Sequence, residues 1–171
     1  LIILPIITMS GGASNTPLPS VDIDKASTTV LSQKFNNGFL NQIAQNKVLD
    51  EEAKTRQMKA DAIDSYFTER DMPLAGTGMK MVLESEKNDL DWRLIAAISV
   101  RESTGGKFEC KKADFYAFGW GSCKIDFNSD EHAIEIVAKN LGGNNPKTAR
   151  HYADKDTFQI LRAYNPPSIV K

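Results

Sequence analysis

The chain has 171 residues, 41% of them hydrophobic and 25% charged, which is enough for one domain with a buried core and an appendage. Its formal net charge is −1, so it lacks the basic excess that neutralises nucleic-acid phosphates, and we expect no nucleic acid partner. This charge is compatible with a neutral or anionic polysaccharide.

The first 20 residues combine an apolar segment with a linker. Residues 1–9 are apolar but too short to span a bilayer, and no basic region precedes them. We interpret them as the remnant of a signal peptide or membrane anchor, with a soluble strand as the alternative. Residues 10–20 are rich in Ser, Gly, Asn, Thr and Pro, the composition of a linker. We therefore expect an extracytoplasmic protein, secreted or held at a membrane by its N-terminus.

Residues 21–56 predict a helical extension, either a single stalk or a hairpin. Apolar residues follow mostly helical spacings from Val30 to Ile43, but the Asn-Asn-Gly sequence at 36–38 interrupts them. We expect its charges to face solvent, and the extension suits attachment to a protein assembly. A helical apolar face continues beyond it, formed by Ala62, Ile63, Tyr66 and Phe67.

Residues 57–171 predict the main domain, beginning with two short helices. One proline and two glycines at 73–78 break the first pattern, and the next segment favours a helix that buries Met79, Val82 and Leu83. Asp91 is a candidate cap for the following helix and Trp92 its first residue. We expect that helix to end at Thr104, with Gly105 as the stop, and to bury Leu94, Ile95 and Ile98.

The rest of the domain is predicted to be irregular and then helical. Residues 107–127 lack periodicity, apart from a short β-hairpin that 114–127 could form. Ser129 or Asn128 caps a helix whose apolar stripe is Ile134, Val137, Ala138 and Leu141. A last helix covers residues 157–164. The fold class is therefore mainly α.

The two cysteines, Cys110 and Cys123, favour a disulfide that closes a small loop, which places the domain in an oxidising compartment. The alternatives are two buried thiols in a cytosolic protein, or a metal site that also uses His132 and His151. The spacing of these four residues is not that of a zinc site, so we expect no metal and no cofactor.

Glu102 raises the main chemical question of the sequence. It follows Ile98 by four residues and Ile95 by seven, so helical periodicity places its carboxyl on the buried face, in the last turn. Partial burial and a helix C-terminus both disfavour the charged form. A carboxyl held protonated in this way can donate a proton to a glycosidic oxygen. The alternative is an exposed Glu102 paired with Arg101 or Lys107.

Many glycosidases use a second carboxylate, and several follow in the sequence. Asp126 and Asp114 lie in the irregular aromatic segment and are equal candidates. Glu109 is a further acidic residue, whereas Asp130 and Glu131 are typical of a helix start.

Two further motifs are suited to binding a sugar, although each also fits an ordinary structural role. The Phe-Gly-Trp-Gly sequence at 118–121 forms a glycine-bracketed loop that presents Trp120, whose flat face could hold a sugar ring or pack in the core. Tyr164 and Asn165 stand at a helix end stopped by proline. Their hydroxyl and amide could contact a carboxyl or an acetamido group.

Together these segments resemble the lysozyme-like superfamily. The stretch "LDWRLIAAISVRESTGGK" is similar to the catalytic helix of soluble lytic transglycosylases and goose-type lysozymes, where a Glu-Ser pair, here Glu102-Ser103, supplies the general acid. "AYN", ending in Tyr164 and Asn165, matches their tyrosine-asparagine motif. The middle motif differs from that of the transglycosylases, which have Gly-Leu-Met-Gln where this sequence has "GWGS". "AFGWG" with "DFNSDEHAIEIVAKNL" is more similar to the endo-N-acetylglucosaminidase family of peptidoglycan hydrolases.

The resemblance covers roughly residues 57–171 and implies a peptidoglycan-cleaving glycosidase, either a lytic transglycosylase or a glucosaminidase or muramidase. Glu102 would be its acid, and the substrate-binding residues would be Ser103, Gly119, Trp120, Tyr164 and Asn165. Because the superfamily domain normally closes with one more helix, we expect the sequence to stop short of the domain's end. The alternative is a wall-binding or structural component of an envelope assembly that keeps this fold without activity.

Overall fold

The computed structural model describes residues 25–122 and 124–166, with side chains at Lys34 and from Asn37 onward. The chain divides into two units, Leu1–Gln45 and Asn46–Lys171. The expected apolar segment and linker of residues 1–20 lie outside the described residues, as does Cys123. Within the described part all regular structure is helical, which confirms the mainly α class.

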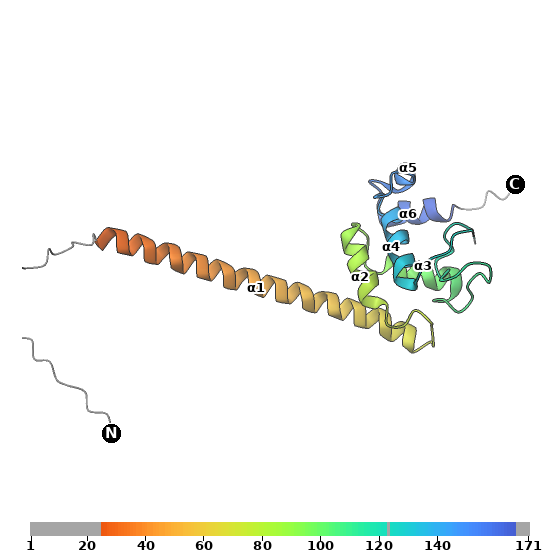
Figure 1. The fold of residues 1–171 in the computed structure, drawn as a ribbon, viewed down its shortest axis with the longest axis horizontal. Helices are drawn as coiled ribbons and strands as arrows, with labels where there is room; N and C mark the ends of the chain where they lie inside the picture. Colours follow the sequence, from red (N-terminus) through yellow and green to blue (C-terminus); the bar gives the residue numbers. More distant parts are fainter. Residues whose placement is uncertain (1–24, 123, 167–171) are drawn as a thin grey trace, which may run out of the picture. The chain divides into compact units, whose positions relative to one another are not determined.

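Helix α1, Lys25–Thr68, is one uninterrupted helix of 44 residues (Figure 1). Of the two alternatives for this region, a hairpin is not formed, and the Asn-Asn-Gly sequence at 36–38 that interrupts the apolar spacing does not interrupt the helix. Gly38 costs a helix only about 1 kcal/mol relative to alanine, and the Glu, Lys, Ala and Gln residues further along the helix are strong helix formers. Within Leu1–Gln45, the described side chains from Asn37 on are exposed, including Phe39, Leu40 and Ile43.

The last turns of α1 belong to the core of Asn46–Lys171. Ala60, Ile63 and Phe67 are buried, whereas Ala62 and Tyr66 face solvent, so the predicted apolar face was only partly right. The Asp64 carboxylate accepts hydrogen bonds from the backbone N–H groups of two residues that precede or begin the next helix, Gly76 and Gly78. These bonds join α1 to the following turn.

Helix α2, Gly78–Lys87, crosses close to α1. A Cβ atom at Gly78 would lie 2.4 Å from the Ala60 carbonyl oxygen, so this crossing requires glycine. Met81 and Val82 are buried, and Met79 is partly buried. Leu83 was predicted to face inward but is 45% exposed, because the buried side of α2 instead contains Met81, Val82 and Ser85.

Helix α3, Leu94–Ser103, packs against α2 and α4. Leu94, Ile95 and Ile98 are buried as predicted. The helix starts later than expected: Arg93 is the N-cap, and Asp91 accepts a hydrogen bond from the Arg93 backbone N–H at 2.9 Å. At the other end Thr104 adopts a left-handed conformation, and Gly105 follows with φ of +64°.

Helix α4, Asp130–Leu141, forms as predicted. Ser129 is the N-cap, its hydroxyl accepts from the His132 backbone N–H, and the apolar stripe is buried. Helix α5, Ala149–Tyr152, is a single turn that the sequence pattern did not indicate. Helix α6, Thr157–Tyr164, has the predicted bounds and starts with a capping box between Asp156 and Gln159.

The segment between α3 and α4 is irregular, and its described residues contain no strand. Of the two alternatives for 114–127, the hairpin is not formed. Phe115, Gly119, Gly121 and Ser122 all have positive φ, which prevents the alternating extended backbone of paired strands. The segment is nevertheless anchored in the core, since Tyr116, Ala117, Phe118 and Phe127 are buried.

Candidate functional site

Glu102 occupies the last turn of α3, in line with buried Ile98, but its side chain is exposed. The expected partial burial is therefore wrong. The next residue, Ser103, is buried, so the end of the helix still packs on the core and only the face that carries Arg101 and Glu102 is open to solvent. The exposed carboxyl forms no ion pair with Arg101 or Lys107.

Two hollows meet at Glu102. The first, of about 230 Å³, lies between α3 and α6 and is lined by Ala97, Ile98, Arg101, Glu102, Leu161, Tyr164 and Asn165. The second, of about 500 Å³, is lined by Glu102, Gly119, Trp120, Gly121, Ser122, Tyr152, Tyr164 and Asn165. Three residues, Glu102, Tyr164 and Asn165, border both hollows. The structure thus brings together five of the residues singled out in the sequence, from segments up to 63 positions apart. We call the two hollows together the Glu102 groove.

Gly119 lies directly against the Glu102 carboxyl. It has φ of +64°, and a Cβ atom added there would lie 2.6 Å from Oε2 of Glu102 and 3.1 Å from its Cδ. Glycine is needed here both for the backbone conformation and for the space that the carboxyl fills. The 118–121 loop therefore positions Glu102.

Ser103 does not line the groove, although the sequence suggested that it would bind substrate. It is 3% exposed. Its hydroxyl donates to the Ala117 carbonyl oxygen at 2.7 Å and accepts from the Gly106 backbone N–H at 2.8 Å. Ser103 thereby connects the end of α3 to the loop that carries Gly119, so it has a structural role next to the candidate acid.

Tyr164 connects α6 to the same loop. Its hydroxyl donates a hydrogen bond to the Phe118 carbonyl oxygen. Burial raises the pKa of the Tyr164 hydroxyl above its ordinary value, and the nearby Glu102 carboxylate raises it further. The hydroxyl therefore remains a proton-bearing donor throughout the neutral range, beside Glu102.

Aromatic rings form one wall of the larger hollow. The Trp120 ring stacks on Tyr164 with centroids 6.0 Å apart and an interplanar angle of 27°. On its other neighbour, Tyr152, the centroid distance is also 6.0 Å, with a tilt of 42°. Tyr152 comes from α5, so it could have been linked to the site only if that short helix had been predicted.

Asp114 and Asp126 lie away from Glu102. Neither lines the Glu102 groove, and both are exposed. Instead the Asp114 backbone N–H donates weakly to Asp126 Oδ1, at 3.4 Å, across the base of the loop. The Asp126 carboxylate and the Asp114 backbone thus suit a loop-closing role.

Glu109 is a partly buried carboxyl in the same loop. Its Oε2 accepts from the Tyr116 backbone N–H at 3.0 Å. Burial raises the pKa of the Glu109 carboxyl, and the charge of Asp130 adds to the rise. Glu109 also lies outside the lining of the Glu102 groove, so its proton is not available to a ligand bound there.

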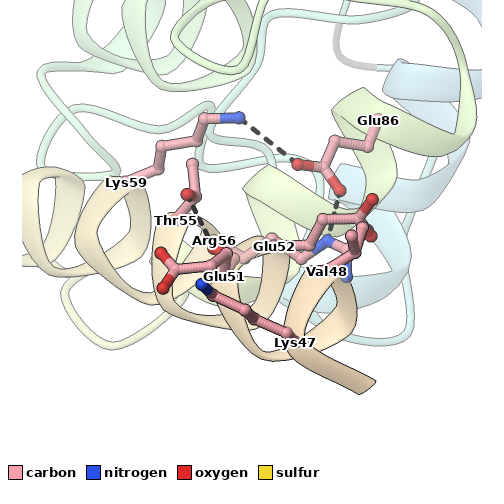
Figure 2. A pocket seen from close by; sticks show the side chains of 8 residues that line it. All are labelled: Lys47, Val48, Glu51, Glu52, Thr55, Arg56, Lys59 and Glu86. Atoms are coloured by element: carbon pink, nitrogen blue, oxygen red, sulfur yellow. Dashed lines mark hydrogen bonds and ion pairs between the residues drawn. The ribbon is translucent and has the colours of Figure 1, made fainter. Parts of the chain in front are cut away.

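A different hollow, of about 570 Å³, lies between α1 and α2 (Figure 2). Four of its charged side chains, Glu52, Arg56, Lys59 and Glu86, are paired with one another. Glu86 accepts from Arg56 Nε at 2.6 Å and from Lys59 Nζ at 3.3 Å, and Arg56 also contacts Glu52 at 3.4 Å. The Arg56 guanidinium holds the pKa of the Glu86 carboxyl below its usual range. We call this set the α1–α2 charge cluster.

The remaining predicted features concern the cysteines, metal sites and membranes. Cys110 is disulfide-bonded, and its predicted partner Cys123 lies outside the described residues. Across residues 25–122 and 124–166, no three His, Cys, Asp or Glu side chains converge as metal ligands would. No helix in that same part of the chain combines the length and apolar character needed to cross a bilayer.

Comparisons of this chain with protein-family models, with curated proteins and with solved structures gave no match.

Proposed function

We propose that this chain is a peptidoglycan-cleaving glycosidase with a lysozyme-like helical domain, in which Glu102 is the general acid. One observation carries the proposal. The Glu102 carboxyl lies where two hollows meet, against the Gly119 backbone, and the other residues around it include Trp120, Tyr164 and Asn165. Glu102, Tyr164 and Asn165 are residues of the motifs that resemble lytic transglycosylases, and Gly119 is the one residue of their middle motif that matches.

The groove suits a linear glycan. A strand lying along both hollows would place one sugar on each side of Glu102, with the bridging oxygen next to its carboxyl. The part of the Trp120 ring that borders the larger hollow offers apolar surface for a sugar ring, and the Asn165 amide can contact an acetamido group. The bond addressed is the β-1,4 bond between N-acetylmuramic acid and N-acetylglucosamine.

The carboxyl groups that line the Glu102 groove favour transglycosylation over hydrolysis. Among the described residues that line the two hollows, Glu102 is the one carboxyl. In this route Glu102 protonates the bridging oxygen, the C1–O bond breaks, and the acetamido oxygen of the muramic acid bonds to C1. The Glu102 carboxylate then takes the proton from the sugar's 6-hydroxyl, whose oxygen displaces the acetamido oxygen and forms a 1,6-anhydro ring. Glu102 ends the cycle protonated.

Digestion of purified cell-wall sacculi, followed by mass spectrometry of the products, tests the proposal. We expect wild-type protein to release fragments with 1,6-anhydromuramic acid ends. Glu102→Gln should reduce release by roughly 10²- to 10⁴-fold, the usual contribution of a general acid. Glu86→Gln is the matched control, because it removes a carboxylate from the α1–α2 charge cluster and should leave release unchanged.

Reducing ends in place of anhydro ends would show hydrolysis and contradict the transglycosylase route. Full release by Glu102→Gln, or no release by wild-type protein, would contradict the enzyme proposal itself. Sacculus binding without turnover would instead indicate the alternative, a wall-binding component of an envelope assembly.

The substrate also sets the location that we propose for the protein, outside the cytoplasm. A disulfide at Cys110 supports this proposal because such bonds persist in oxidising compartments. The exposed Phe39, Leu40 and Ile43 on α1 support a role for the N-terminal helix in a protein assembly.

A further inference from the structure

The hollow between α3 and α6 contains an arginine. Helical spacing explains its position, because Arg101 follows Ala97 by four residues just as Glu102 follows Ile98, and all four line the hollow. From α6, Leu161 and Asn165 are also four residues apart and face it. Arg101 therefore lines the α3–α6 hollow, whereas Trp120 and Tyr152 line only the larger one.

Arg101 differs from every other arginine of the described chain. Three of them pair with carboxylates: Arg56, Arg70 and Arg93. Arg150 donates to His151, and Arg162 lies over the Phe158 ring. Within residues 25–122 and 124–166, the Arg101 guanidinium alone has no hydrogen bond, ion pair or ring contact. Its five donors are therefore free to bind a ligand.

We propose that Arg101 binds the carboxylate carried on the lactyl arm of N-acetylmuramic acid and so seats that sugar in the α3–α6 hollow. This inference rests on the proposed function. N-acetylmuramic acid differs from N-acetylglucosamine by this arm at O3. The arm ends in a carboxylate where the glycan is free of peptide, and in the stem peptide, with its own carboxylates, where it is substituted. A guanidinium recognises such a carboxylate in a bidentate geometry.

The assignment places each sugar in one of the two hollows. With muramic acid beside Arg101, a neighbouring N-acetylglucosamine lies in the larger hollow, against Gly119 and Trp120. Transglycosylation at C1 of muramic acid then requires the strand orientation in which this N-acetylglucosamine is the one bonded to that C1. Arg101 is thus a specificity residue that determines which sugar occupies the α3–α6 hollow.

Ligand binding can test this assignment without relying on turnover. Full-length protein carrying Glu102→Gln, which keeps the ligand intact, is titrated with three tetrasaccharides by calorimetry. One is a peptide-free muramic acid–glucosamine fragment, the second is the same fragment with stem peptides, and the third is chitotetraose. We expect the muramic acid fragments to bind roughly 10- to 100-fold more tightly than chitotetraose. Adding Arg101→Gln should abolish that preference, and Arg101→Lys should keep part of it.

Arg162→Gln is the charge-matched control on α6, because its guanidinium lies over Phe158, and it should keep the full preference. Loss of preference for the peptide-free fragment assigns the lactyl carboxylate as the ligand. Loss confined to the peptide-bearing fragment assigns a stem-peptide carboxylate and overturns the lactyl contact. An unchanged preference in Arg101→Gln, or equal binding of all three ligands by the parent protein, would overturn the assignment altogether. Failure of the sacculus digestion alone would concern the proposed function and not this contact.

Discussion

The α1–α2 charge cluster and the Glu102 groove both place acidic and basic side chains around a hollow, but they use these charges differently. In the cluster, Glu86 contacts two cations, and Arg56 contacts two carboxylates. In the groove, Glu102 and Arg101 are neighbours on α3, and neither has an ionic partner among the described residues.

This difference separates charges that serve the fold from charges free to act on a ligand. Paired charges satisfy one another, so a ligand would have to displace an existing partner. Unpaired charges at a groove can interact with a bound ligand without first losing a protein partner. The α1–α2 charge cluster is therefore the weaker candidate site, although its hollow has more charged residues. Four substitutions test this comparison.

Gly119→Ala should have the largest effect, because the new Cβ would lie 2.6 Å from the Glu102 carboxyl oxygen. Displacing the acid by about 1 Å can reduce turnover roughly 10²-fold. Gly76→Ala is the control: Gly76 has φ of +92°, but a Cβ atom added there would have nothing within 4 Å. Both variants should lose about 1–2 kcal/mol of stability from backbone strain. Equal turnover of the two variants on sacculi would show that Gly119 does not position Glu102.

Tyr164→Phe should reduce kcat/KM on sacculi by roughly 10-fold and lower the free energy of unfolding by about 1 kcal/mol. The substitution keeps the stacking on Trp120 but leaves the Phe118 carbonyl oxygen without its donor. Tyr152→Phe is the comparison for stability, since it also borders Trp120 but its hydroxyl has no hydrogen bond within the described chain. A denaturation midpoint equally lowered in both would contradict the role of the Tyr164 hydroxyl.

Glu86→Gln should lower stability and leave turnover on sacculi unchanged, whereas the main effect of Glu102→Gln should be on turnover. Because Arg56 lowers the pKa of Glu86, the ion pair stabilises the fold above the ordinary carboxyl pKa, and this contribution is lost as the pH falls. Exposed pairs contribute little, so thermal denaturation at pH 7 should show a decrease of a few degrees at most. Glu69→Gln, whose partner Arg70 is more exposed, should show less. Reduced turnover in Glu86→Gln would remove the distinction between the two hollows.

Glu109→Gln should have the smallest effect, a slight stabilisation at neutral pH. Burial raises the pKa of Glu109, so the folded state binds the proton more tightly, and wild-type stability falls as the pH rises past the ordinary carboxyl pKa. Glutamine keeps an acceptor for the Tyr116 N–H without the buried charge. Thermal denaturation between pH 4 and pH 7 should show an advantage that disappears at the acidic end. Glu131→Gln should instead lower stability at neutral pH and lose this effect at the acidic end, since its hydrogen bond with Ser129 lowers the pKa of Glu131.

Local sequence patterns were sufficient to predict the helices whose apolar stripes are strong and whose caps are local. The buried stripe of α4, its Ser129 cap and the bounds of α6 depend on residues within one or two turns, so spacing was sufficient to predict them. The sequence also indicated the candidate site residues Glu102, Gly119, Trp120, Tyr164 and Asn165, because motifs of given residue types in a given order can be recognised without a structure. The sequence left open whether the first helix continues past Gly38 or turns into a hairpin, since local breaker rules overstate the effect of one glycine in a long helix.

The positions of these side chains relative to one another depend on tertiary packing and could not be predicted from local patterns. Helical periodicity placed Glu102 on a buried face, but burial depends on which segments cover that face, and the segments around the end of α3 leave Glu102 exposed. Ser103 and Tyr164 bond to carbonyl oxygens of a loop 14 and 46 residues away, which no local pattern contains. Arg101 becomes a candidate ligand-binding residue for the same reason: its lack of a partner can be recognised only when every other charged group of the described chain has been located.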